Sequence, residues 1–241
     1  MDYNWNSKKR KIYFLSEDKD ETNEKNEKIE KEVSKSEKKK FVWDGLTDSN
    51  LISSVKNHIY FYAGVTKKSC MNLNIEIRKA ANDLMANRNN FKNLDTYIYI
   101  HINSFGGSVF AAMSTIDTIV NCPIPIVTII EGAAASAATL ISVVADKRLM
   151  TKNSFMLIHQ LSSMTWGKME ELEEEMTNLR KLMTKIKNIY IKHTNLEGSE
   201  LDEILKHDIW WNSNKCLETG LIDKIIEPTK VYSVKEDNLE L

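Results

Sequence analysis

The sequence has no excess of charge of either sign and few cysteines. Its 33 lysine and arginine residues nearly balance 34 aspartate and glutamate residues, which leaves a formal net charge of -1. Because a strong field of one sign would be needed to recruit them, we expect neither nucleic acid nor an anionic membrane as a partner. The three cysteines lie far apart without a C-x-x-C pair, and the five histidines are scattered. The sequence therefore predicts no disulfide framework, no metal site and no cofactor.

Targeting and membrane-spanning segments are not evident either. The first residues lack the apolar stretch of a secretory signal, and their many acidic residues are unlike a transit peptide. Residues 118–145 carry a single charge, Glu131, but Pro123, Pro125 and Gly132 interrupt them. We interpret that segment as a buried strand followed by a buried helix rather than a membrane span. By elimination, we expect a cytoplasmic protein.

Composition divides the chain into three parts. Residues 1–45 are mostly lysine, glutamate, aspartate, asparagine and serine, and bury too little apolar surface to offset chain entropy, so we expect a disordered tail. Residues 46–230 are long enough for one ordinary α/β domain, and residues 231–241 are expected to be a flexible C-terminal tail. The first tail could also be a removable propeptide, and its basic run at 8–11 could be a nuclear address.

Strand and helix patterns alternate within the central part. Residues 58–63 and 96–102 are rich in β-branched and aromatic residues and predict strands, with a helix over 69–88 between them. Further along, the pattern predicts a helix that Gly106 and Gly107 open and that ends near 120, a strand at 125–130, a helix at 133–145 and a strand at 155–159. This alternation indicates an α/β fold whose parallel strands are joined by right-handed crossovers.

A long amphipathic helix is predicted from residue 168 to about 193. Its apolar residues recur every three or four positions, and its acidic first half and basic second half complement the helix dipole. About 25 residues extend close to 40 Å at 1.5 Å per residue, more than one compact domain needs. Part of this helix could pack on another subunit, although periodicity alone is equally typical of an internal amphipathic helix.

Four features could carry chemistry, and each alone has a simpler explanation. Ser136 stands in the small-residue run 132–138, near the start of a predicted helix where backbone N–H groups are unpaired, but it could merely be a helix cap. Gly106 and Gly107 follow a predicted strand and could form an ordinary turn. His159 ends an apolar run and Asp208 closes a helix-like stretch, as core or loop residues often do.

Taken together, these features have the order and spacing of a known family. Residues 102–109 (INSFGGSV) resemble the I-N-S-P-G-G-x-[VI] loop of the Clp protease (ClpP) family, and residues 132–138 resemble its G-x-A-A-S-M-[AG] segment. Residues 156–160 (MLIHQ) are similar to its M-I-H-Q-P motif, and residues 208–223 keep its spacing from the catalytic aspartate to G-L-[IV]-D. The resemblance implies a ClpP/crotonase-like spiral of β-α units with a protruding handle helix.

The resemblance also implies how the site works. Ser136 would be the nucleophile, His159 the base and Asp208 the residue that orients the base, as in a Ser-His-Asp triad. The backbone N–H groups of Gly107 and Ala137 would form the oxyanion hole. An extended substrate would pair with the segments after Gly107 and after His159, whose binding residues would be Gly106, Ser108, Val109, Gln160 and Leu161.

The partners that the resemblance implies are copies of the same chain and an AAA+ ATPase. The expected assembly is two stacked seven-membered rings that enclose the sites and receive unfolded polypeptides from the unfoldase. Phe105 and Leu161 replace prolines of the family motifs. Lys206 and His207 replace the acid and arginine that often precede the catalytic aspartate and link ring contacts to activity.

Three other functions use related folds. One is an enoyl-CoA hydratase-like (crotonase-like) enzyme, which also sets a glycine-containing oxyanion hole against a thioester. Another is a non-catalytic ring subunit, in which the three catalytic positions would be free to change. The third is a membrane-associated signal-peptide peptidase relative, which the polar composition disfavours. The complete Ser-His-Asp set favours the peptidase.

Overall fold

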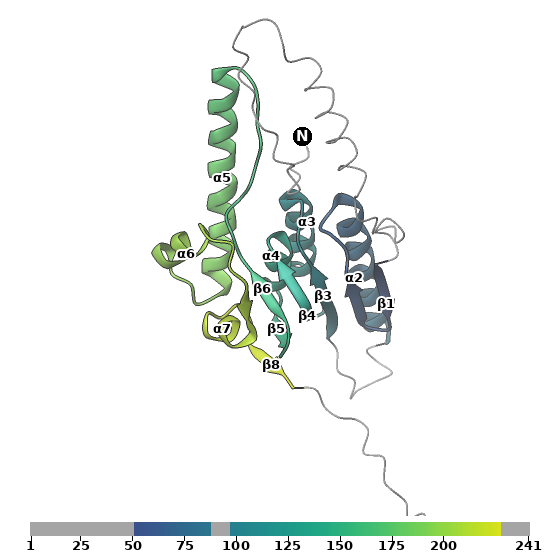
Figure 1. Cartoon of the computed structure of the whole chain (residues 1–241). Helices are drawn as coiled ribbons and strands as arrows, with labels where there is room; N and C mark the ends of the chain where they lie inside the picture. Colours follow the sequence, from purple (N-terminus) through teal and green to yellow (C-terminus); the bar gives the residue numbers. More distant parts are fainter. Residues whose placement is uncertain (1–50, 88–96, 228–241) are drawn as a thin grey trace, which may run out of the picture.

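The computed structural model describes residues 51–87 and 97–227, and they form a twisted sheet with helices packed against it (Figure 1). The sheet has eight strands. Its main path runs β1-β2-β3-β4-β5-β8, with β6 beside β4 and β7 beside β6. The strands span Ile52–Val55 (β1), His58–Phe61 (β2), Ile98–Ser104 (β3), Ile126–Ala135 (β4), Lys147–Thr151 (β5), Phe155–Leu157 (β6), Trp211–Asn212 (β7) and Lys224–Ile226 (β8). The tails predicted at 1–45 and 231–241 lie outside the described residues.

The parallel arrangement expected from the sequence is confirmed for the central strands. Strands β2, β3, β4, β5 and β8 pair in parallel, whereas β1 forms an antiparallel hairpin with β2 and β7 is antiparallel to β6. In β2 and β3 the isoleucines and Phe61 are fully buried, while the alternate Tyr60 and Tyr99 stay partly exposed. This period of two follows from the pleat of a strand and turns the apolar side chains toward the helices.

The helices follow one another along the sheet. Helix α2 (Lys67–Asn87) contacts α3 (Val109–Val120), α3 contacts α4 (Ala137–Val143), and α4 contacts the long α5 (Met169–His193). Short helices α6 (Gly198–Ile204) and α7 (Ser213–Glu218) complete the described chain. No helix within the described residues is both long and apolar enough to cross a membrane.

The prediction was wrong for the small-residue segment before Ser136. A helix was expected over 133–145, but Ala133, Ala134 and Ala135 belong to β4, where they pair in parallel with β6, and the helix begins only at Ala137. Alanine favours helices on its own. Here the main chain of residues 133–135 forms hydrogen bonds with β6, and the small side chains allow close packing. These tertiary contacts outweigh the preference of alanine for a helix.

The long helix agrees with its prediction and occupies two environments. At its C-terminal half Ile186, Ile189 and Tyr190 are buried in the core. Its N-terminal half projects beyond the sheet (Figure 1), and Met169 and Met176 there are exposed. The helix is therefore longer than this domain can cover.

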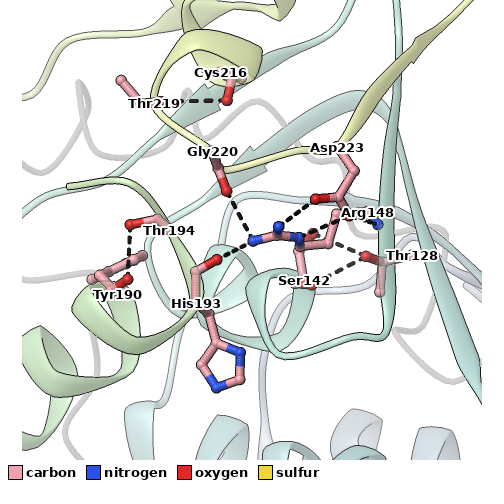
Figure 2. Close-up of polar contacts among 10 residues, drawn as sticks. All are labelled: Thr128, Ser142, Arg148, Tyr190, His193, Thr194, Cys216, Thr219, Gly220 and Asp223. Atoms are coloured by element: carbon pink, nitrogen blue, oxygen red, sulfur yellow. Dashed lines mark hydrogen bonds and ion pairs between the residues drawn. The ribbon is translucent and has the colours of Figure 1, made fainter.

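Arg148 of β5 ties the end of α5 and the C-terminal segment to the sheet (Figure 2). Its guanidinium donates to the carbonyl oxygens of His193 and Gly220 and forms an ion pair with Asp223. Asp223 also accepts from the Arg148 backbone N–H at 2.8 Å, and these contacts lower the pKa of its carboxyl group against the opposing effect of burial. One side chain thus fixes the two segments that precede and follow the region around Asp208.

Candidate active site

Ser136 occupies a sharp turn between β4 and α4. Its backbone has φ 56° and ψ -126°, a conformation that a residue with a side chain adopts at a cost of about 1–3 kcal/mol. The turn is held because Ser136 N–H donates to the Leu157 carbonyl at 2.8 Å. The side chain is 8% exposed, and its Oγ has no hydrogen-bond partner among the described residues. A strained serine at a strand-to-helix turn is the arrangement of a nucleophile elbow.

Two glycines pack directly against this turn. A Cβ on Gly106 would lie 2.8 Å from Ser136 Cβ and 2.5 Å from the Ala135 carbonyl oxygen, and a Cβ on Gly107 would lie 2.3 Å from the Val65 carbonyl oxygen. Both residues also have positive φ angles, 87° and 146°. Only glycine meets both requirements, so the pair brings one backbone against the serine rather than forming an ordinary surface turn.

Two backbone N–H groups belong to the residues that follow Gly106 and Ser136, which pack against each other. Ala137 is the first residue of α4, where N–H groups have no intrahelical acceptor. Gly107 forms a parallel bridge with Val65 through the Gly106 carbonyl and the Ser108 N–H, which directs the N–H of Gly107 itself away from Val65. These are the two donors that the sequence analysis assigned to an oxyanion hole.

His159 and Asp208 form a hydrogen-bonded pair. His159 Nδ1 lies 2.7 Å from Asp208 Oδ1. Leu157, two residues before His159, pairs with Ala135, one residue before Ser136, so the serine and the histidine leave neighbouring strands at the same edge of the sheet. Since a carboxylate only accepts, the contact favours a proton on Nδ1 and leaves Nε2 to accept one. The structure therefore joins the histidine to the aspartate and places the serine at the end of the neighbouring strand, whereas Ser136 Oγ makes no hydrogen bond to His159.

A buried pair of hydroxyl groups supports the serine turn, and no sequence motif signalled it. Thr139 Oγ1 donates to the Ser136 carbonyl at 2.6 Å and lies 2.6 Å from the Tyr190 hydroxyl. Because the threonine proton is used for Ser136, the tyrosine must donate to the threonine. Both side chains are at most 1% exposed, and burial raises the pKa of Tyr190. Helix α5 is thereby connected to the backbone of the nucleophile.

The predicted substrate-binding residues differ in whether their backbone N–H groups already donate within the chain. Gly106 lies against the serine turn. Ser108 is extended but its N–H donates to Val65 and its Oγ caps α3, and Val109 is buried as the first residue of that helix. Beyond His159, the N–H groups of Gln160 and Leu161 already donate to Leu205 and Met183. After Gly107, Ser108 is therefore the one extended residue before α3 begins at Val109.

Other chemistries have less support in the described part of the chain. Residues 51–87 and 97–227 contain no cluster of three histidine, cysteine, aspartate or glutamate side chains that could hold a metal ion. Burial raises the pKa of the three thiols, and that of Cys216 reaches about 12, so none of them is an activated nucleophile.

Comparisons with known proteins agree with this geometry. Residues 55–229 match the family model described as Clp protease. Over 141 residues the chain is 32% identical to the ATP-dependent Clp protease proteolytic subunit of Deinococcus radiodurans, covering 58% of this chain and 69% of that protein. A solved structure of a ClpP1 mutant from Listeria monocytogenes superimposes with a TM-score of 0.60 at 21% identity, covering 70% of this chain and 90% of the other.

Proposed function

The chain belongs to the Clp protease family, and we propose from this membership and the site geometry that it is a serine endopeptidase acting through Ser136, His159 and Asp208. The observation that carries the proposal is the combination of a strained, buried serine with a histidine and aspartate paired at 2.7 Å on the same sheet edge. An enoyl-CoA hydratase-like site would need the two N–H donors but not this set of side chains.

The first half of the reaction forms an acyl-enzyme. Ser136 Oγ attacks the scissile carbonyl carbon and gives its proton to His159 Nε2. Asp208 stabilises the imidazolium, while the N–H groups of Gly107 and Ala137 stabilise the negative oxygen of the tetrahedral intermediate. As the intermediate collapses, the C–N bond breaks and His159 gives its proton to the departing amine.

The second half restores the enzyme. Water gives a proton to His159 and its oxygen attacks the acyl carbon, forming a second tetrahedral intermediate on the same two donors. When the bond to Ser136 Oγ breaks, His159 returns the proton to the serine and the carboxylic acid product leaves. Every step uses groups of this chain and water only.

Membership of the family also implies self-assembly and partnership with a Clp ATPase. We propose two stacked heptamers that enclose the sites, with unfolded polypeptides as substrates and the cytoplasm as the compartment. The boundaries proposed for the peptidase domain are 46–230. Its described part begins with β1, which pairs with β2 at the edge of the sheet.

A fluorophosphonate probe tests the proposed nucleophile. We expect the probe to label the wild-type protein at Ser136 and to leave Ser136→Ala unlabelled. Cleavage of unfolded casein should fall by about 10⁴-fold or more in Ser136→Ala and in His159→Ala, because the triad acts as a unit. Ser162→Ala, which removes an exposed hydroxyl from the segment after His159, is the matched control and should behave like the wild type. Labelling nowhere, with no cleavage, would instead indicate a non-catalytic subunit or a thioester enzyme.

A further inference from the structure

Two exposed aromatic side chains meet beside the candidate active site. Phe105 lies in the loop after β3, immediately before Gly106, and Trp210 lies two residues after Asp208. Their ring centroids are 6.1 Å apart and their planes are nearly perpendicular, at 87°, which is the edge-to-face geometry that aromatic pairs favour. The pair therefore joins the loop that carries the oxyanion donor to the loop that carries the acid.

The exposure of the pair leaves room for a third group. Phe105 is 74% and Trp210 is 41% exposed. Trp211, by contrast, packs against the core and pairs with Met156 of β6. Exposed aromatic surface that is continuous with a reactive centre is typical of a binding surface for an apolar ligand group. The replacement of a family proline by Phe105 supplies half of this surface.

The position of the pair indicates which side of the substrate it would meet. The departing amine takes its proton from His159 Nε2, so the leaving half of the substrate passes the imidazole. Asp208 holds the opposite edge of that ring, and Trp210 is carried by the same short segment. Trp210 is thus linked to the histidine through the segment of Asp208, and Phe105 is linked to the serine turn through Gly106, so the pair borders both parts of the site.

We propose that Phe105 and Trp210 form a subsite that binds the side chain of the substrate residue immediately after the scissile bond and selects a large apolar residue there, above all an aromatic one. This inference rests on the proposed peptidase function. A substrate ring would cover the free faces of both side chains, adding apolar burial and a further aromatic contact. Apolar subsites of this kind typically discriminate by about 10- to 200-fold per group.

Matched peptides test the subsite. Two internally quenched peptides would differ only in the residue after the scissile bond, phenylalanine in one and glycine in the other. For the wild type we expect kcat/KM to favour the phenylalanine peptide by at least about 10-fold. Phe105→Ala and Trp210→Ala should each lose most of this preference, measured as the ratio of kcat/KM for the two peptides. Leu217→Ala removes an equally exposed apolar side chain from α7 and should keep the preference.

A second measurement isolates the leaving side. Preformed acyl-enzyme can be captured by phenylalanine amide or glycine amide, which enter where the leaving group departed. In Phe105→Ala the capture ratio of phenylalanine amide to glycine amide should fall by about the same factor as the preference between the two peptides. Equal capture of both amides by the wild type, or an unchanged preference in both variants, would overturn the subsite. Serine-probe labelling separates this result from a failure of the peptidase assignment, because labelling at Ser136 persists if only the subsite is wrong.

Discussion

At the scale of single residues, Asp208 stands in an unusual environment for a triad acid. Its side chain is 76% exposed, whereas that of its partner His159 is 20% exposed. Water weakens the attraction between an exposed carboxylate and an imidazolium, so the electrostatic part of its role is reduced. Its orienting role does not depend on burial, because the hydrogen bond to Nδ1 sets the tautomer at any dielectric.

The orienting role predicts the effect of Asp208→Asn. An amide N–H₂ facing Nδ1 would favour the tautomer with the proton on Nε2, which cannot accept from Ser136. We expect kcat to fall by about 10³- to 10⁴-fold, near the loss known for a triad acid changed to its amide. Steady-state peptide cleavage measures this. Asp202→Asn, which removes an exposed ion pair with Lys187, is the control. If it proved as damaging as Asp208→Asn, the third triad member would be misassigned.

A second group of titratable residues lies on the sheet away from the triad. His58 Nδ1 lies 2.9 Å from His101 Nε2, and His101 Nδ1 lies 2.8 Å from Glu131. Tyr62 donates to the same carboxylate, and burial together with that bond raises the pKa of Tyr62 to about 12. The Glu131 carboxylate accepts a hydrogen bond from His101 Nδ1–H. His101 Nε2 therefore carries no proton in the neutral ring and accepts the hydrogen bond from His58 Nδ1–H.

This cluster predicts that mild acid destabilises the fold. Burial, and secondarily the neighbouring His101, lowers the pKa of His58 below 6.5, against the opposing effect of Glu131. The unfolded chain therefore binds more protons than the folded chain as the pH falls below about 6.5, and stability is lost from there down through the folded pKa. Urea unfolding from pH 7.5 to 5 measures this.

A change in the cluster tests the acid effect, and a change at a histidine outside the cluster is its control. His58→Phe, which can still stack on Tyr99, should have a shallower pH dependence, whereas His207→Gln in the exposed bend after α6 should keep the wild-type slope. Equal slopes in all three proteins would show that the histidine pair does not control acid stability.

At the scale of secondary-structure elements, the sequence predicted what depends on local pattern. The long α5 and the strands rich in isoleucine and tyrosine have strong local signals, whereas the glycine pair alone predicted only a turn. Strand β5 (KRLMT) was missed because two of its five residues are basic and its alternation is weak. The Thr139–Tyr190 contact joins residues 51 positions apart, so no local pattern contains it. The triad was predicted from the family motifs, because the spacing of the residues alone did not identify it.

The contact between α4 and α5 predicts a coupled loss of activity. Tyr190→Phe removes the donor to Thr139, and Thr139→Val leaves the tyrosine hydroxyl buried without its acceptor. We expect destabilisation of about 0.5–1.5 kcal/mol for Tyr190→Phe and about 1–3 kcal/mol for Thr139→Val. Thr139→Val leaves the Ser136 carbonyl with the Thr139 N–H alone, and Tyr190→Phe removes the group that fixes the Thr139 hydroxyl, so kcat should fall several-fold with little change in KM.

A double-mutant cycle decides whether this contact acts as a unit. The double variant should cost less than the sum of the single changes, in kcat as well as in the free energy of unfolding. Ile189→Val, a change in the buried face of the same helix, should lower stability without a specific loss of kcat. Additive effects of the two hydroxyl changes on kcat would exclude a positioning role.

At the scale of the whole molecule, the described domain leaves half of α5 without a partner. Leu172 and Leu179 are half-buried, Met169 and Met176 are exposed, and the core covers the helix from Leu182 onward. Burial of such a stripe in a second copy of the chain would be symmetric and would remove apolar surface from water. The charged residues 1–45 have no comparable apolar content, so we assign assembly to α5 and not to that segment.

Changes in the two segments should therefore have opposite consequences. Leu179→Glu places a charge on the apolar stripe and should lower both the particle mass and the peptidase activity, whereas deletion of residues 1–45 should leave both within about twofold of the wild type. Thr177→Glu adds the same charge at an exposed polar position of α5 and controls for charge alone. Size-exclusion chromatography with light scattering, run beside a cleavage assay, measures each variant. A Leu179→Glu particle of unchanged mass and activity, or dissociation on loss of residues 1–45, would mean that the terminal segment and not α5 holds the subunits together.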